Sequence, residues 1–421
     1  MRKLLRLCPT SNSHIVAFSR SVLLGCFCLA LCAPALRAQS LQVLHAFTGE
    51  SDGIYPESSL TFDRAGNLYG TTYGGRGSFY GSVYELMRHN SSWIFKTLYT
   101  FRAQNDGQNP ESPVIFGPDG LLYGATPYGG YTNCFGHYCG TVYNVQPPAR
   151  ACANVSCPWN ENAVYWFGQN QINDGFIPGT GPLVFDSAGN LYGTTQDGGL
   201  TNNGIVFQLF RTQGGWGENI LYNFPGEGGI AHPQASVTLD SAGNLYGTVM
   251  SPSHGAVYKL VNNGGQWTEQ TLYSFQGGAD GNDPEGGVIF DSAGNLYGTT
   301  AGVNNPATVF QLSPQTDGTW RETVLHVFSS SVGPKTNLAM DSAGNLYGTT
   351  QGLGGGDQFG MVFKLSRVNG SWTFTTIYQF TNGTDGAYPV GGVTVDAAGN
   401  LYGTCAGGGA NGYGTVWEIT P

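Results

Sequence analysis

Residues 63–72 read Asp63-Arg-Ala-Gly-Asn-Leu-Tyr-Gly-Thr-Thr72, and near copies of this decapeptide recur along the chain. The close copies begin at Asp186, Asp240, Asp291, Asp341 and Asp396. A degraded copy, Gly117-Pro-Asp-Gly-Leu-Leu-Tyr-Gly-Ala-Thr126, fills the gap after the first one. Seven copies whose starts lie 50 to 69 residues apart indicate a tandem repeat in which each copy forms one supersecondary unit.

Each repeat is predicted to fold as four short antiparallel strands. An apolar run such as 288–290 forms the first strand, and Ala-Gly-Asn supplies a hairpin turn because its residues tolerate positive φ. Leu-Tyr-Gly-Thr-Thr forms the second strand and a run such as 360–365 the third, while the fourth starts at a tryptophan and ends at a phenylalanine eight residues later. This pattern predicts an all-β, seven-bladed β-propeller over residues 39–421, with an insertion at about 127–158.

The two ends of the repeat array complement each other. The chain ends on a third strand, 415–419, while residues 43–47 match the end of a fourth strand such as 271–275. We therefore expect the N-terminal strand to complete the last blade and close the ring, which removes the exposed strand edges.

The composition agrees with this fold and excludes several classes of protein. Glycine supplies 66 of 421 residues, hydrophobic residues 40% and charged residues 10%, so a large core is expected and wholesale disorder is not. The sequence lacks the periodic glycine of collagen and the charged heptads of a coiled coil. The 17 basic and 27 acidic residues give a net charge of −10, which argues against a nucleic-acid-binding protein.

The N-terminal 38 residues have the pattern of a secretion signal. Four basic residues within the first twenty precede the apolar run 22–36, and Ala38 precedes the expected cleavage site. The run is short for a transmembrane span, so we expect a removed signal peptide, 1–38, and a secreted or periplasmic protein without a further membrane segment. An uncleaved N-terminal anchor and a lipidated Cys26 are the alternatives.

The decapeptide resembles the GloVer (Gloeobacter–Verrucomicrobia) tandem repeat of exported bacterial proteins, and the likeness covers residues 41–421. The resemblance implies an exported repeat protein but no particular activity. Members are described as choice-of-anchor proteins because different sorting signals follow the repeats. This chain ends at Pro421 without such a tail, so release is expected. The layout is also similar to NHL-repeat propellers, which supports the fold alone.

Residues that repeat in every blade are expected to serve the scaffold, whereas departures from the repeat are candidates for a site. The motif tyrosines and the fourth-strand tryptophans are therefore assigned to packing between blades. The variable loops emerge on the face opposite the Ala-Gly-Asn turns, here called the loop face. Loops on a rigid scaffold are where binding sites concentrate.

An Asp-Gly-x-x-Pro pattern occurs in five loops that join a fourth strand to the next first strand. Its aspartates are Asp52, Asp106, Asp174, Asp280 and Asp385. Carboxylates around one mouth could bind Ca²⁺, which takes several oxygen ligands. We favour a structural interpretation, because Asp-Gly forms turns and no loop has the density of a calcium-binding motif. No cofactor is required on this interpretation.

The loops between second and third strands are rich in aromatic residues. The candidates are Tyr73, Phe79, Tyr80, Tyr128, Tyr131, Phe135, Tyr138, Phe359 and Tyr413. Aromatic rings suit the apolar faces of sugars or a protein partner. The alternative is that these rings fold over the glycines of their own loops.

Histidines supply the only signal for catalysis. His232 and His254 fall in two loop-face loops of one blade, near Glu227, where they could act as general acid and base or bind a metal. Neither lies in a recognised motif, and solvated loop histidines are common. His45 and His326 replace a fourth-strand tyrosine and are assigned to the scaffold.

Four cysteines flank the third strand of the blade that carries the insertion. Cys134 and Cys139 precede this strand, 141–146, and Cys152 and Cys157 follow it. The strand spans about 20 Å, too far for a disulfide across it, so the pairs 134–139 and 152–157 are predicted. A zinc site that includes His137 is the alternative. A further cysteine, 405, replaces a motif threonine and is expected to be a buried free thiol.

Three functions are consistent with the sequence. The first is an exported, non-catalytic monomer that binds a glycan or a protein partner through the loop face. The second is an extracellular carbohydrate-active enzyme, a lyase or a hydrolase. The third is a passive component of the envelope or matrix. We expect no nucleic-acid partner, and no membrane partner once the signal is removed.

Overall fold

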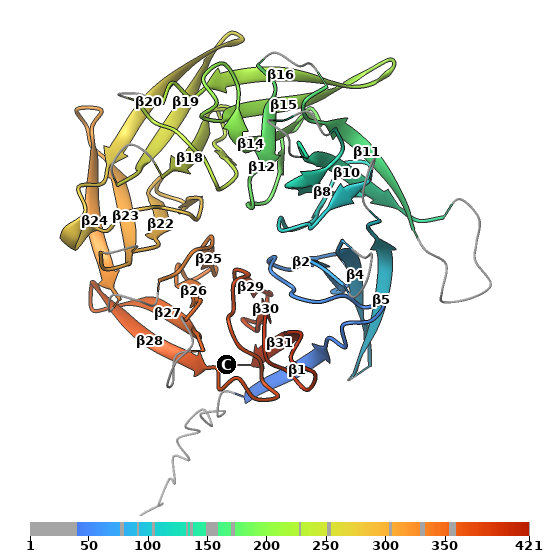
Figure 1. Cartoon of the computed structure of the whole chain (residues 1–421). Helices are drawn as coiled ribbons and strands as arrows, with labels where there is room; N and C mark the ends of the chain where they lie inside the picture. The colour runs from blue at the N-terminus through green and yellow to red at the C-terminus, as the bar shows by residue number, and fades with distance from the viewer. Residues whose placement is uncertain are drawn as a thin grey trace, which may run out of the picture. The chain divides into compact units, whose positions relative to one another are not determined.

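Four-stranded antiparallel sheets surround a central axis in the computed structural model, with first strands innermost and fourth strands outermost (Figure 1). The structure describes residues 40–75, 80–90, 92–102, 106–131, 134, 138–148, 159–169, 173–226, 229–250, 254–302, 305–328, 333–352 and 359–420. Within these ranges seven sheets have four strands or more, which confirms the predicted seven-bladed propeller. The predicted signal peptide lies outside the described residues.

The blades follow the repeats, and each contains four main strands. Blade 1 consists of β2 (Thr61–Phe62), β3 (Leu68–Thr72), β4 (Ser82–His89) and β5 (Ser92–Thr100). Blade 2 consists of β7 (Ile115–Phe116), β8 (Leu122–Thr126), β10 (Thr141–Gln146) and β11 (Asn160–Trp166). Blade 3 consists of β13 (Val184–Phe185), β14 (Leu191–Gly198), β15 (Ile205–Thr212) and β16 (Gly215–Asn223). Blade 4 consists of β17 (Thr238–Leu239), β18 (Leu245–Val249), β19 (Ala256–Asn263) and β20 (Gln266–Ser274).

The remaining blades have the same layout. Blade 5 consists of β21 (Ile289–Phe290), β22 (Leu296–Thr300), β23 (Thr308–Pro314) and β24 (Trp320–Val327). Blade 6 consists of β25 (Ala339–Met340), β26 (Leu346–Thr350), β27 (Met361–Val368) and β28 (Ser371–Gln379). Blade 7 consists of β29 (Thr394–Val395), β30 (Leu401–Cys405), β31 (Thr415–Thr420) and β1 (Ser40–Ala46). The additional elements are β6 (Gly107–Gln108), paired with β9 (Tyr128–Gly129), then β12 (Gly175–Pro178), paired with β14, and a 3₁₀ turn, Gly278–Asp280.

The ring closes as the sequence predicts. The N-terminal strand β1 pairs antiparallel with β31, in a register that runs from Ser40 opposite Thr420 to Ala46 opposite Thr415. Both strands occupy blade 7, so the last blade is built from the two ends of the repeat array (Figure 1). This pairing covers the outer edge of β31 and gives β1 its partner strand.

The repeated decapeptide forms a hydrogen-bonded turn. Asp63 Oδ1 accepts hydrogen bonds from the backbone N–H groups of Ala65 and Asn67, and Asp63 Oδ2 accepts from the Asn67 amide and the Tyr69 hydroxyl. The turns at Asp186, Asp240, Asp291, Asp341 and Asp396 have the same bonds. The motif aspartates, asparagines and tyrosines therefore belong to the scaffold.

Blade 2, which carries the degraded copy, keeps some of these bonds through Asp119, which accepts from Leu121 N and from the Tyr123 hydroxyl, and gains others from outside the blade. Leu121 stands where the other copies have asparagine. Arg211 of blade 3 donates to Asp119 Oδ2 at 2.7 Å and to the Tyr123 hydroxyl at 2.9 Å. Its guanidinium also lies over the Trp216 ring, 4.1 Å from the centroid. An arginine from the neighbouring blade thus compensates for the missing asparagine.

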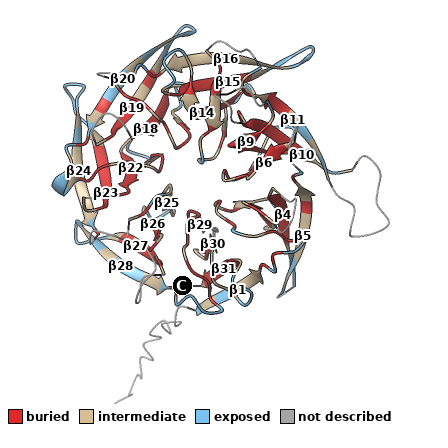
Figure 2. Cartoon of the chain, in the orientation of Figure 1, coloured by how far each residue is buried: buried red, intermediate tan, exposed pale blue. Residues whose placement is uncertain are grey.

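Buried residues concentrate in the inner strands of the blades (Figure 2), and neighbouring blades are joined by aromatic contacts. The phenylalanine that follows each fourth strand packs against an aromatic ring in the third strand of the next blade, with centroids 5.0 to 5.8 Å apart. The pairs are Phe47–Tyr84, Phe101–Tyr143, Phe167–Phe207, Phe224–Tyr258, Phe275–Phe310, Phe328–Phe363 and Phe380–Trp417. The seven phenylalanines are at most 4% exposed, so the core lies between the sheets. In the part of the chain described here, no helix is long and apolar enough to cross a membrane.

Candidate functional site

A central cavity of about 430 Å³ is lined by residues of all seven blades. The lining comes mainly from the short segments that lead into the first strands, directly after the loop-face prolines. The residues that follow these prolines and line the cavity are Glu57, Glu111, Gln234, Glu285, Lys335 and Val390. The cavity therefore opens toward the loop face with a ring of side chains that differ from blade to blade.

The backbone before each proline is held firmly. Tyr55, which precedes Pro56, donates its N–H to Tyr413 O of blade 7 and accepts a hydrogen bond from Tyr73 N of blade 1. Its φ is +56°, a left-handed conformation that is costly for a residue with a side chain. The equivalent residues with positive φ are Asn109, Ile177, His232, Asp283 and Tyr388. These connections fix where the next side chain enters the cavity.

Two carboxyl groups, Glu57 of blade 1 and Glu111 of blade 2, line the cavity, and a tyrosine lies within electrostatic range of both. Burial and the nearby carboxylate of Glu111 raise the pKa of Glu57 to about 7, and burial raises the pKa of Glu111 to about 6. Burial also raises the pKa of Tyr73, as do the neighbouring Glu111, Tyr128 and Glu57. Tyr73 therefore lies within electrostatic range of the other three side chains, and two of the four, Tyr73 and Tyr128, are predicted binding residues.

The opposite side of the cavity carries an ion pair. Lys335 Nζ lies 3.1 Å from Glu285 Oε1, and both residues line the cavity. The charge of Glu285 is thereby balanced within the protein. Glu57 and Glu111 have no such partner among the described residues, which leaves their side of the mouth acidic.

A groove of about 440 Å³ adjoins the cavity over blade 7. Tyr55 and Tyr388 line it together with Asn382 and a glycine-rich segment, 406–409. Glu57, Gln351 and Val390 line both the groove and the central cavity. Tyr55 is 40% exposed, so the groove offers an accessible aromatic surface continuous with the mouth.

Sequence reasoning missed Glu57, Glu111, Tyr55 and Tyr388. A usable signal was present, because the position after the loop proline differs from blade to blade while its surroundings repeat. The aspartate and the proline of Asp-Gly-x-x-Pro shape the loop itself. The variable residues on either side of the proline are the ones that face the cavity and the groove.

Several other predicted aromatic residues belong to the scaffold. Tyr80, Phe359 and Tyr413 pack against the hydrophobic clusters between blades, and the Tyr413 ring lies over Gly49. This matches the alternative that such rings cover loop glycines. Tyr131 is 49% exposed. Tyr138 is partly exposed, while Phe79 and Phe135 lie outside the described residues.

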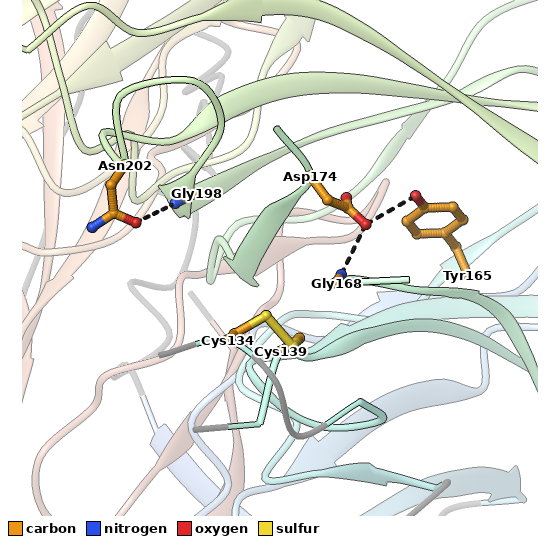
Figure 3. The surroundings of a disulfide bond; sticks show 7 residues. All are labelled: Cys134, Cys139, Tyr165, Gly168, Asp174, Gly198 and Asn202. Atoms are coloured by element: carbon orange, nitrogen blue, oxygen red, sulfur yellow. Dashed lines mark hydrogen bonds between the residues drawn. A yellow bond between two sulfur atoms is a disulfide. The ribbon is translucent and has the colours of Figure 1, made fainter. Parts of the chain in front are cut away.

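The five loop aspartates brace their own loops. Each accepts a hydrogen bond of 2.8 to 2.9 Å from the backbone N–H that follows the fourth-strand phenylalanine. Each also contacts the aromatic side chain two residues before that phenylalanine, at 2.9 to 3.2 Å. Figure 3 illustrates this for Asp174, Gly168 and Tyr165. The aspartates Asp52, Asp106, Asp174, Asp280 and Asp385 thus stand in separate loops, consistent with the structural interpretation of the pattern.

The candidate histidines lie on opposite sides of blade 4. His232 Nδ1 is 3.2 Å from both Gln196 O and Asp197 Oδ1 of blade 3. The His254 carbonyl accepts a hydrogen bond from Asp283 N, and its ring lies over Gly277 in the loop toward blade 5. No contact within the described residues joins the two histidines, and Glu227 lies outside them. Both occupy positions that link blades, so the structure gives no support to a catalytic pair.

One predicted disulfide is confirmed. Cys134 and Cys139 are bonded, with α-carbons 5.4 Å apart (Figure 3). Cys152, Cys157 and His137 lie outside the described residues. Cys405 is a buried free thiol, as predicted. Across the described ranges, no group of three or more His, Cys, Asp or Glu side chains is arranged to hold a metal ion.

Comparisons with solved structures agree with the fold. An ulvan lyase, described as a new family of polysaccharide lyase, matches with a TM-score of 0.54 and 8% identity over 90% of this chain and 95% of that one. PorZ, a surface component of the type-IX secretion system of Porphyromonas gingivalis, matches with a TM-score of 0.51 and 14% identity over 88% of this chain and 47% of that one. These distant likenesses bear on the fold alone.

Sequence comparison identifies the family. No curated protein matches the chain. The family model of the Gloeobacter/Verrucomicrobia repeat matches residues 34–253 and 178–417, which together span most of the sequence. The repeated decapeptide and its hydrogen-bonded turn lie within this region. The chain therefore belongs to the Gloeobacter/Verrucomicrobia repeat family.

Proposed function

We propose that this protein is an exported, non-catalytic propeller that binds a saccharide at the mouth of its central cavity. The observation that carries the proposal is that Glu57 and Glu111 line that cavity and that Tyr73 lies within electrostatic range of both glutamates and of Tyr128. Tyrosine rings stack on the apolar faces of sugars. Carboxyl groups in partly buried positions accept hydrogen bonds from sugar hydroxyls, and a protonated one also donates.

The shape of the mouth supports an extended ligand. The cavity of about 430 Å³ and the groove of about 440 Å³ share Glu57, Gln351 and Val390. Each volume falls in the range of small-molecule sites, about 300–1,000 Å³. A short oligosaccharide lying from the mouth into the groove would contact Tyr73 and Tyr128 at one end and Tyr55 and Tyr388 at the other.

The charges favour a neutral or amine-bearing sugar over an acidic one. Glu57 and Glu111 face the mouth without a basic partner among the described residues, and the whole chain carries a net charge of −10. A uronate or sulfate group placed beside these carboxylates would meet like charge in a partly buried site, where repulsion is weakly screened. We therefore expect polyanionic glycans to bind poorly.

The test is a binding titration with a panel of oligosaccharides. The purified protein is titrated calorimetrically with cello-, xylo- and chito-oligosaccharides, with chitosan oligosaccharide and with oligogalacturonate. We expect a neutral or amine-bearing member to bind, and Tyr73→Ala, Tyr128→Ala and Glu111→Gln each to weaken that binding about tenfold, or about 1.4 kcal/mol. Leu200→Ala, a change at a loop residue that is 65% exposed, serves as the control and should leave affinity within about twofold.

Two results would overturn the proposal. One is the absence of binding by every sugar of the panel, which would favour a protein partner or a passive role. The other is binding that the three variants leave unchanged. Chromatography of the sugars after incubation separates binding from catalysis, because a lyase or hydrolase would release shorter products.

A further inference from the structure

At six of the seven blade junctions, one pair of positions has either of two chemistries. The first member of the pair stands two residues before the fourth-strand phenylalanine of one blade. It faces the second member, which stands six residues before the equivalent phenylalanine of the next blade. At two junctions a histidine stacks on a phenylalanine, with His45 and Phe95 centroids 3.9 Å apart and His326 and Phe374 centroids 3.8 Å apart. At four junctions a tyrosine faces a glutamate instead. These pairs are Tyr99–Glu161, Tyr165–Glu218, Tyr222–Glu269 and Tyr273–Glu322.

At the junction between blades 2 and 3, one tyrosine hydroxyl contacts two carboxyl groups. The Tyr165 hydroxyl lies 2.8 Å from Glu218 Oε2 and 3.2 Å from Asp174 Oδ2. A hydroxyl has one hydrogen, so it can donate to only one of these two carboxyl oxygens. The second short contact is favourable when that carboxyl group carries a proton and donates to the phenol oxygen. Two carboxyl groups converging on one tyrosine therefore favour the retention of a proton.

The junction between blades 1 and 2 has the same components. Asp106 Oδ2 accepts hydrogen bonds from the Tyr99 hydroxyl and from Arg102 N, both at 2.9 Å. Glu161 Oε1 and Asp106 Oδ1 are buried and have no hydrogen-bond partner among the described residues. Burial and the charge of Asp106 raise the pKa of Glu161 to about 8. The other groups that face this pair are the Arg102 guanidinium and the fully buried Tyr143 hydroxyl.

The junction between blades 4 and 5 has the same three residue types as the junction between blades 1 and 2. The Tyr273 hydroxyl donates to Asp280 Oδ2 at 3.0 Å, and Glu322 Oε1 is buried without a hydrogen-bond partner among the described residues. Burial and the charge of Asp280 raise the pKa of Glu322 to about 7. The titratable groups that face Glu322 are Tyr273, from β20, and Asp280, from the turn that follows this strand.

We propose that the blade 1–2 and blade 4–5 junctions each hold a proton at neutral pH on a glutamate whose Oε1 is buried, so that the folded ring is most stable in mildly acidic solution and loses stability at these junctions as pH rises. The direction of this pH dependence follows from the difference in proton binding between the folded and unfolded states. Glutamates that keep a proton in the fold and lose it on unfolding favour the folded state at low pH. That stabilisation is lost between the unfolded value, about 4.5, and the folded values, about 7 for Glu322 and about 8 for Glu161.

The His–Phe junctions show which residue pair can replace a Tyr–Glu pair in a test of this proposal. Burial lowers the pKa of His45 and of His326, so these junctions hold neutral rings at neutral pH. Converting the blade 1–2 junction to this type requires Tyr99→His and Glu161→Phe together. The loop aspartate, Asp106, stays in place, as Asp52 does beside His45. Glu269→Gln is the matched control, because Gly229 stands where that junction would need the loop aspartate.

The experiment measures urea unfolding of the full chain between pH 5 and pH 8.5. We expect the unfolding equilibrium constant of the wild type to rise with pH. Glu161→Gln, Glu322→Gln and the Tyr99→His/Glu161→Phe variant should each lower this rise by up to tenfold per pH unit within the window, whereas Glu269→Gln should not alter it. Infrared absorption of protonated carboxyl groups at pH 6.5 should fall in Glu161→Gln.

Two results would overturn the inference. The first is a pH slope in Glu161→Gln and Glu322→Gln equal to that of the wild type, whatever their absolute stability. The second is a wild-type protein whose stability rises from pH 5 to pH 8. Because the readout is the slope, a uniform loss of stability in a variant leaves the test intact.

Discussion

Tyr258 carries a hydroxyl group that the scaffold does not use. The residue is fully buried in the third strand of blade 4, and its hydroxyl has no hydrogen-bond partner among the described residues. Blades 3, 5 and 6 place phenylalanine at the equivalent position, with the ring in the same contact with the strand glycine. An unpaired buried hydroxyl lowers the free energy of unfolding by about 1–3 kcal/mol. Each of its few van der Waals contacts raises the free energy of unfolding by only about 0.1–0.2 kcal/mol.

We therefore expect Tyr258→Phe to raise the free energy of unfolding by about 1 kcal/mol. Urea unfolding followed by fluorescence would show this as a higher midpoint with an unchanged slope. The reverse change, Phe310→Tyr, places a hydroxyl at the same position of blade 5 and should lower stability by about 1 kcal/mol or more. A loss of more than about 1 kcal/mol in Tyr258→Phe would show that the hydroxyl is hydrogen-bonded in solution and would refute the reasoning.

Three further changes test the scaffold by urea unfolding. Arg211→Met should cost about 1 kcal/mol, because Asp119 and the Tyr123 hydroxyl each lose a hydrogen bond from the guanidinium while they keep the one that joins them. Phe47→Ala should cost about 3–5 kcal/mol, because this buried ring joins the closing strand to blade 1; a cost below about 1 kcal/mol would contradict the closure. Gly360→Ala should cost more than about 1 kcal/mol, since φ is +91° and an added methyl group would meet Pro389 of the next blade.

The fold could be predicted because the same pattern of strands and turns recurs in seven repeats. The motif turn, the fourth-strand phenylalanine and the matching chain ends are local patterns, and each has a direct structural meaning. Cys134 and Cys139 could likewise be paired from their spacing and the length of one strand. These predictions needed only the geometry of a single blade.

The candidate site depends on how blades face one another, which a single repeat does not reveal. Glu57 and Glu111 stand 54 residues apart, and only the ring places them on the same side of the cavity mouth. His232 and His254 show the opposite case. Their loops share one blade and one face, yet each loop bonds to a different neighbouring blade. Tyr80 and Tyr73 both lie in the same loop of the sequence. Only the packing shows that Tyr80 belongs to the scaffold, whereas Tyr73 lies within electrostatic range of Glu57 and Glu111.

A crystal structure of the protein with the tightest-binding oligosaccharide of the panel tests the central claim most directly. The account predicts a sugar ring stacked on Tyr73 or Tyr128, with hydroxyl groups bonded to Glu57 or Glu111 at the mouth of the cavity. A sugar bound elsewhere on the propeller, with this mouth empty at saturating concentration, would contradict it.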